Sequence, residues 1–254
     1  MKRPVHDPET LANHRQIQRR MARLRQFGYD SPAAIQFVLE QASPLGGSVL
    51  EIGTGKGRFL VRLAPQATSV TTVDVSAEEQ HCARLSARYA GVEDKIRFVR
   101  RDAARLPWRA AAFDAAVTMN AMHHIPHFER VLEEMLRVVK PGGKIVLADF
   151  SPRGFQILAR EHRDQGKTHP RERYDFRKLQ RLLDKKGMAT RLCKGCNQEM
   201  LVALVPAASN FAASHNSWRG RASSRAHLPS GTQKTRAREE ARLPLARRHS
   251  QRLV

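Results

Sequence analysis

The chain has 254 residues, enough for one α/β domain with extensions, and it carries a formal net charge of +21 with an isoelectric point near 11.1. This charge predicts contact with nucleic acid or an anionic membrane, or it is only solvated charge in an arginine-rich proteome. No apolar run approaches the roughly 20 residues of a membrane span, and the residues after Lys2-Arg3 are too polar for a signal peptide. Three cysteines are too few for a disulfide framework. We therefore expect a soluble, cytoplasmic protein.

The first predicted element is a basic helix that begins with the cap and proline Asp7-Pro8 and ends at Gly28. Its apolar stripe consists of Ile17, Met21 and Leu24. The opposite face is rich in arginine. We interpret residues 1–30 as a helical lid or cap over the main domain. The alternative is a basic helix that grips an anionic substrate.

From residue 31 onward, strands alternate with helices. Strands are predicted at residues 49–52, 69–75, 96–99, 113–119, 144–150, 188–194 and 198–205. Helices are predicted after Ser31-Pro32, at 59–67, after the cap Ser76 with Cys82, Leu85 and Tyr89 inward, at 127–139 and at 175–186. Residues 140–143 (KPGG) are predicted as a turn, and residues 151–173 as irregular, with a short helix from Gly154. This alternation predicts a doubly wound, Rossmann-like α/β fold with a mostly parallel sheet, closed by a hairpin that turns at residues 195–197.

Residues 31–205 are thus predicted to form the main domain, and residues 206–254 a tail of different character. The tail contains ten Lys/Arg and two Asp/Glu, and it shows no apolar periodicity. Such a segment cannot bury enough apolar surface to fold alone, so we predict disorder. It could bind nucleic acid, or it could be an extension without function or a frameshifted or read-through end.

Residues 49–57 (VLEIGTGKG) indicate a buried strand that enters a glycine-rich turn and opens a helix, which is typical of a nucleotide-binding corner. A dinucleotide fingerprint has the spacing G-x-G-x-x-G and holds a pyrophosphate. Here Gly53, Gly55 and Gly57 are spaced G-x-G-x-G, and Glu51 precedes them. A carboxylate there would repel a pyrophosphate but suit a cation. S-adenosylmethionine carries an ammonium and a sulfonium and no phosphate, so charge and spacing both favour it over NAD.

Polar residues follow the next three strands. Asp74 ends the second strand, where a carboxylate can accept both ribose hydroxyls of an adenosine; its other interpretation is a cap for the helix at Ser76. Asp102, or the backbone of Ala103, is placed to meet an adenine amino group, unless Asp102 only bonds its own turn. Asn120 ends the fourth strand, beside the crevice in which ligands bind in open α/β sheets.

The segments EIGTGKG, VDVS, RRDAARLPW, FDAAVTMNAMHHIP and RVVKPGGKIVLADF together resemble the class I S-adenosylmethionine-dependent methyltransferases. The resemblance covers roughly residues 31–205 and is closest to the small-molecule branch that includes the ubiquinone and menaquinone methyltransferases. It implies a seven-stranded sheet of order 3-2-1-4-5-7-6 with strand seven antiparallel, and in-line transfer of a methyl group. By position, it implies that S-adenosylmethionine is bound by Glu51, Gly53, Thr54, Gly55, Gly57, Asp74, Val75, Asp102, Ala103 and Asn120. Lys56 lies where family members vary, and we expect its side chain to point to solvent.

A methyl group on a sulfonium is already electrophilic, so the protein mainly has to position the nucleophile. A general base is needed only if the nucleophile carries a proton. The candidates for such a base are His123, His124, Asp149, His169 and Tyr174. We favour His123, which follows the fourth strand, and Asp149, which ends the fifth strand at the same edge of the sheet.

Three other functions stay open. An RNA or DNA methyltransferase would fit the charge, but no Asn/Asp-Pro-Pro-Tyr/Phe motif follows the fourth strand, where residues 120–123 read NAMH. An NAD-dependent reductase is disfavoured by the glycine spacing. A cofactor-binding protein without catalysis is compatible with the sequence, because in-line transfer needs no diagnostic residue. We predict no metal site, since Cys193 and Cys196 form a lone pair and structural zinc takes four ligands. The oligomeric state is left open.

Overall fold

The computed structural model describes residues 4–166 and 174–207. The candidate His169 and nearly all of the predicted tail lie outside this part. In the described residues, no helix is both long enough and apolar enough to cross a membrane.

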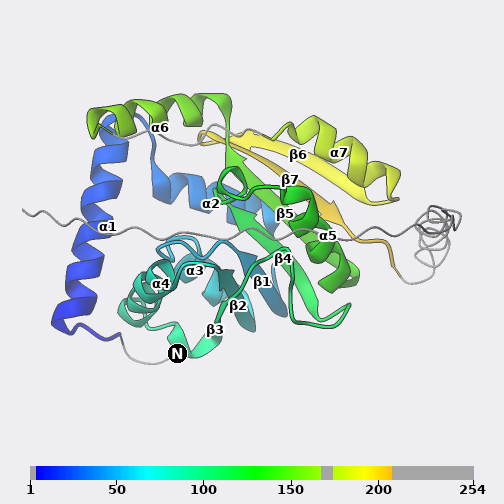
Figure 1. Ribbon diagram of the computed structural model, residues 1–254, viewed down its shortest axis with the longest axis horizontal. Helices are drawn as coiled ribbons and strands as arrows, with labels where there is room; N and C mark the ends of the chain where they lie inside the picture. The colour runs from blue at the N-terminus through cyan, green and yellow to red at the C-terminus, as the bar shows by residue number, and fades with distance from the viewer. Residues whose placement is uncertain (1–3, 167–173, 208–254) are drawn as a thin grey trace, which may run out of the picture.

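Seven strands form one sheet in the order β3-β2-β1-β4-β5-β7-β6 (Figure 1). The strands are β1 (Ser48–Ile52), β2 (Ser69–Asp74), β3 (Ile96–Arg100), β4 (Phe113–Met119), β5 (Val139–Phe150), β6 (Ala189–Gly195) and β7 (Gln198–Leu204). β7 runs antiparallel to both of its neighbours, and the other pairs are parallel. The predicted Rossmann-like order and the antiparallel seventh strand are therefore confirmed.

Helices cover both faces of this sheet. One face packs against α2 (Ser31–Ala42), α3 (Leu60–Leu63) and α4 (Ala77–Tyr89), and the other against α5 (Phe128–Val138) and α7 (Phe176–Lys185). Strand β1 shows how alternation divides the core: Val49 belongs to the first cluster, whereas Leu50 and Ile52 belong to the second.

Two further helices, α1 (Pro8–Gln26) and α6 (Pro152–Asp164), lie at one end of the molecule (Figure 1). Helix α1 contacts α4 through residues of its first half, such as Glu9 and Asn13, and contacts α6 near its other end (Figure 1). As predicted, the side chain of Asp7 caps α1 by accepting a hydrogen bond from the backbone of Thr10, and a proline opens the helix. We refer to α1 and α6 together as the covering helices.

The covering helices are attached to the same turn between β6 and β7. Cys196 and Asn197 form this turn with left-handed φ angles of 49° and 61°, as a two-residue hairpin requires. The Asn197 side chain donates a hydrogen bond of 3.2 Å to the carbonyl of Gly28, at the end of α1. The backbone of Ser151, which caps α6, donates one of 2.9 Å to the carbonyl of Asn197.

The sequence predicted an irregular segment at residues 151–173 with only a short helix from Gly154, but Pro152–Asp164 form the 13-residue helix α6. The polar composition concealed the buried side chains Ile157 and Leu158. A signal was nevertheless present, because Ser151-Pro152 repeats the cap-and-proline pattern that starts α1 and α2.

Three smaller expectations also need correction. Residues 140–143 belong to β5, which passes through an irregular register opposite Phe113 before its regular pairing starts at Lys144. The helix predicted at residues 59–67 is α-helical only over Leu60–Leu63 and continues as a 3-10 turn. In α4, Leu85 is buried, whereas Cys82 and Tyr89 are half-buried under α1.

Candidate functional site

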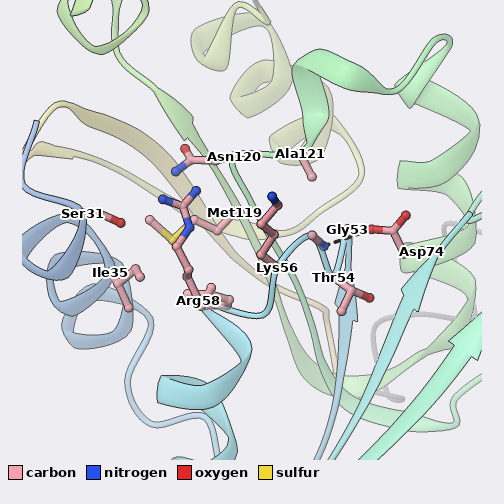
Figure 2. Close-up of a pocket in the computed structure, with 12 residues that line it drawn as sticks. Ser31, Ile35, Gly53, Thr54, Lys56, Arg58, Asp74, Met119, Asn120 and Ala121 are labelled. Carbon is pink, nitrogen blue, oxygen red and sulfur yellow. Dashed lines mark hydrogen bonds between the residues drawn. The ribbon is translucent and has the colours of Figure 1, made fainter. Parts of the chain in front are cut away.

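The pairing of β1 with β2 and β4 brings the ends of these strands to one edge of the sheet. The glycine loop (Gly53–Gly57), Asp74 and Asn120 meet at this edge. The first four residues of the loop, Gly53 to Lys56, line a cavity of about 150 Å³ together with Asp74 and Asn120, and α2 contributes Ser31 and Ile35 (Figure 2). Gly57 lies outside this lining, so its contact with a cofactor stays a prediction. The sequence therefore placed its central motif, its ribose-binding candidate and its strand-four candidate in one site.

The first two glycines of the loop have different tasks. Gly53 has a φ of +85°, and a Cβ atom added there would lie 2.3 Å from the Cβ atom of Ala121. Gly53 therefore lets the loop after β4 approach closely. Gly55 has a φ of +46°, and a Cβ atom there would meet nothing within 4 Å. Its backbone thus forms an open floor of the cavity on which a ligand can rest.

Asp74 holds the start of α4 and lines the cavity, and its contact with a ribose stays a prediction. One carboxylate oxygen accepts a hydrogen bond of 3.0 Å from the backbone of Gly55, and the other accepts one of 2.9 Å from the backbone of Ser76. The carboxylate also lines the cavity (Figure 2). It therefore fixes the glycine loop against the start of α4 and keeps lone pairs available to a ligand. The next residue, Val75, is 63% exposed and does not line the cavity, so its contact with a cofactor stays a prediction.

Asn120 lines the same cavity and carries an unsatisfied polar atom. Its φ of 54° is left-handed, and its side-chain nitrogen donates a hydrogen bond of 3.2 Å to the hydroxyl of Tyr29. Its side-chain oxygen is buried and has no hydrogen-bond partner among the described residues. A buried acceptor without a donor costs about 1–3 kcal/mol, so this atom is suited to receive a donor from a ligand.

Known proteins resemble this chain in sequence and in fold. Residues 50–147 match the family described as Methyltransferase domain. The chain is 34% identical over 127 residues to 27-O-demethylrifamycin SV methyltransferase of Amycolatopsis mediterranei. The aligned part covers 48% of this chain and 47% of that protein. The chain is also 29% identical over 127 residues to a ubiquinone/menaquinone biosynthesis C-methyltransferase of Brucella anthropi. This alignment covers 49% of this chain and 48% of that protein.

A solved structure of a SAM-dependent methyltransferase from Aquifex aeolicus superposes with a TM-score of 0.56 at 22% identity, covering 79% of this chain and all of that one. The chain therefore carries a methyltransferase domain at residues 50–147, and the relatives and solved structures support an S-adenosylmethionine-dependent methyltransferase of class I. The chain spans about half the length of the two sequence relatives, whose acceptors differ from each other.

Glu51 of the methyltransferase domain lies beneath the cavity and does not line it. The residue is 2% exposed, and the hydroxyl of Thr72 donates a hydrogen bond of 2.5 Å to its carboxylate. Thr72 in turn bonds at 2.7 Å to Thr54, which reaches the cavity. Burial raises the pKa of Glu51 to about 8, and the charge of Asp74 adds to this effect. The structure therefore links Glu51 to a ligand through two threonines, and direct contact with the cofactor stays a prediction.

The adenine-binding candidates follow β3 and lie outside the cavity. Asp102 is exposed and accepts a hydrogen bond of 2.9 Å from the backbone of Ala104. This is the local turn that the sequence offered as its alternative. Ala103 is buried. Their contact with an adenine stays a prediction.

The two favoured catalytic candidates form a buried pair. The Nδ1 atom of His123 lies 2.7 Å from one carboxylate oxygen of Asp149, and both residues are 2% exposed. Asp149 also accepts hydrogen bonds from the backbone of His123, at 3.1 Å, and from that of Phe150, at 2.8 Å. Neither residue lines the cavity. The pair joins the loop after β4 to the end of β5, so the geometry favours a positioning role for both residues over a catalytic one.

Sequence reasoning missed Arg58, which follows the glycine motif directly. Arg58 lines the cavity, its Nη1 atom is buried, and this atom has no hydrogen-bond partner in the described part of the chain. Lys56 lines the same cavity, contrary to the expectation that it points to solvent (Figure 2). Both cations come from the motif itself, but the sequence did not show where α1 and α6 would lie above them.

A chain of hydrogen bonds connects α1 to the glycine loop. The side-chain nitrogen of Asn13 donates to the hydroxyl of Ser86 at 3.1 Å, and this hydroxyl donates to the carbonyl of Lys56 at 2.8 Å. Asn13 also donates to the carbonyl of Cys82 at 3.1 Å. The position of α1 therefore depends directly on the loop that lines the cavity.

Proposed function

We propose that this chain binds S-adenosylmethionine at the edge formed by β1, β2 and β4 and transfers its methyl group to a small-molecule acceptor by in-line displacement. The observation that carries this proposal is the cavity in which an open glycine floor, a carboxylate and an unsatisfied amide oxygen meet. The methyltransferase domain at residues 50–147 supports it.

The cavity offers a suitable partner for each part of the cofactor. Gly55 leaves room for the ligand to lie on the backbone. Asp74 is the acceptor for the ribose hydroxyls. The buried oxygen of Asn120 is the acceptor for the ammonium group, which is a hydrogen-bond donor. The exposed Val75 next to Asp74 gives the adenine an apolar surface to cover.

S-adenosylmethionine, when bound, supplies a methyl group that is electrophilic because it sits on a sulfonium. The residues of this chain hold the donor and the acceptor in line, and such positioning can lower a barrier by about 7–11 kcal/mol. Asp149 and His123 fix the loop that carries Asn120 and Ala121. Helix α1 closes the site from above through its link to the glycine loop.

Calorimetry with the full chain tests the proposal. We expect S-adenosylhomocysteine to bind and NADH not to bind; the reverse result would refute it. Asp74→Ala should weaken S-adenosylhomocysteine binding by about tenfold or more, because it removes an ionic acceptor, and His123→Ala should weaken it less. Equal losses would contradict the assignment of Asp74.

A transfer assay with S-adenosylmethionine labelled in its methyl group then separates the possible functions. We expect label in a fraction of small metabolites. Label only in RNA would show a nucleic-acid methyltransferase. Binding of S-adenosylhomocysteine with no transfer to either fraction would indicate a cofactor-binding partner protein without catalysis.

A further inference from the structure

A second cavity, of about 370 Å³, lies between the covering helices and the glycine loop. It shares Gly55, Lys56 and Arg58 with the proposed cofactor cavity, so the two spaces meet beside the loop. A molecule in the second cavity would therefore lie next to the methyl donor. This position makes the second cavity the natural place for the acceptor.

The lining of this cavity is charged and predominantly basic. Five basic side chains line it against two acidic ones, and three of the basic ones come from α1. Ile17 is the only large apolar side chain among the lining residues that the structure describes. Such a lining is unsuited to an apolar acceptor, because an apolar group would remove water from the charged side chains without replacing its hydrogen bonds.

Two of the cations act together. The Nη1 atom of Arg58 is buried without a hydrogen-bond partner, and Arg20 of α1 lines the same cavity. Neither guanidinium forms an ion pair with a carboxylate in the described ranges. Burial lowers the pKa of Arg58 and the positive charge of Arg20 adds to this effect, whereas the charges of Tyr29, Glu79 and Glu161 oppose it. Two like charges that form no ion pair with a carboxylate and line one cavity favour an anion between them.

Glu161 of α6 determines how a bound molecule would be oriented in the cavity. It is fully buried, and one carboxylate oxygen accepts a hydrogen bond from the side chain of Gln165. The other oxygen has no hydrogen-bond partner among residues 4–166 and 174–207 and lies 3.4 Å from Nε2 of His162. A negative charge here would repel an anion. An anionic group is therefore favoured at Arg20 and Arg58, and a hydrogen-bond donor at Glu161.

We propose that the second cavity binds the methyl acceptor and that this acceptor carries an anionic oxygen group, a carboxylate or a phosphate, which Arg20 and Arg58 hold. The rest of the acceptor extends toward Glu161 and presents a donor group to it. This inference rests on the proposed methyltransferase function and adds the chemical class of the acceptor.

Inorganic phosphate is the probe, because it represents the anionic group without the rest of the acceptor. The full chain is saturated with S-adenosylhomocysteine and titrated with phosphate in a calorimeter at constant ionic strength. We expect one phosphate per chain. Arg20→Gln and Arg58→Gln should each weaken its binding by about tenfold or more, since each removes a charge-assisted donor. Glu161→Gln should strengthen it severalfold.

Arg15→Gln is the matched control, because Arg15 is an exposed arginine of α1 that does not line the cavity. This variant loses the same charge and should bind phosphate as the wild type does. Folding is checked by the melting temperature. Arg58→Gln should melt no lower than the wild type, because it removes a buried charge without a partner.

The outcomes distinguish this inference from the proposed function. If S-adenosylhomocysteine does not bind, the proposed function fails. If it binds but excludes phosphate, the two arginines hold the carboxylate of the cofactor and the acceptor proposal is overturned. If Arg20→Gln and Arg58→Gln bind phosphate as tightly as Arg15→Gln does, the phosphate binds elsewhere on the basic surface, and the proposal is likewise overturned.

Discussion

Glu51 should make the protein less stable as the pH rises, and Glu51→Gln should remove this effect. Burial raises its pKa from 4.5 to about 8 in the folded chain. In the unfolded chain the carboxyl releases its proton near pH 4.5. Between these values the folded state holds more protons than the unfolded state does. The stabilisation is therefore complete below pH 4.5 and is lost as the pH rises toward 8.

The size of the effect follows from the pKa shift. Each pKa unit is worth about 1.4 kcal/mol, so the whole shift corresponds to roughly 5 kcal/mol, of which about 3 kcal/mol is lost by pH 7. Glutamine stays neutral at every pH, and its side-chain oxygen can still accept the hydrogen bond from Thr72. The stability of Glu51→Gln relative to the wild type should thus increase by about 1.4 kcal/mol per pH unit between pH 5 and 8.

Equilibrium unfolding in urea, followed by circular dichroism at pH 5, 6, 7 and 8 without ligand, measures this difference. Subtracting the wild type from the variant removes the contribution of all other titrating groups. Glu40→Gln, at an exposed position of α2, controls for the loss of one negative charge. If the difference in unfolding free energy between Glu51→Gln and the wild type does not change across this pH range, the reasoning is refuted. It is also refuted if the wild type becomes more stable relative to the variant toward pH 8.

Three further changes test the site and the domain boundary. Asn13→Ala removes the hydrogen bonds that Asn13 of α1 makes to α4. The melting temperature should therefore fall, and S-adenosylhomocysteine binding in calorimetry should weaken severalfold. If neither quantity changes, the coupling between α1 and the loop is disproved. Gly53→Ala should destabilise the fold by roughly 2–4 kcal/mol in urea unfolding, because the added Cβ atom collides with Ala121. Gly55→Ala should cost about 1 kcal/mol and should mainly reduce the affinity for the ligand. Similar losses of stability in the two variants would contradict this assignment. Removal of residues 208–254 should leave the melting temperature and S-adenosylhomocysteine affinity nearly unchanged, and a large drop in either would place the tail inside the fold.

The sequence predicted those parts of the fold that depend on local patterns. Strands such as β1, β4 and β7 contain short apolar runs, and capping residues such as Asp7, Ser76 and Asp175 mark helix starts that the structure confirms. Parallel strands place their carboxyl ends at one edge, so the meeting of the glycine loop, Asp74 and Asn120 also followed from the pattern.

The missing parts depend on contacts between segments far apart in the chain. Burial of Glu51 and its bond to Thr72, 21 residues away, turn an expected charge into a group with a pKa of about 8. Arg58 became part of the site only because α1 and α6 enclose it. His123 looked like an accessible base, but packing against β5 buries it on Asp149. Neither periodicity nor motif spacing contains information on such packing.

The turn at Asn197 gives both covering helices one common attachment point. A rotation at this point would move α1 and α6 together and would change the width of the space between them and the glycine loop. The rate at which acceptor enters and product leaves would then depend on a hairpin that contacts neither molecule. Substitutions at Asn197 should consequently change the turnover rate while the affinity for the cofactor stays the same. Entry of the acceptor and release of the product are then controlled separately from the methyl-transfer step in this protein.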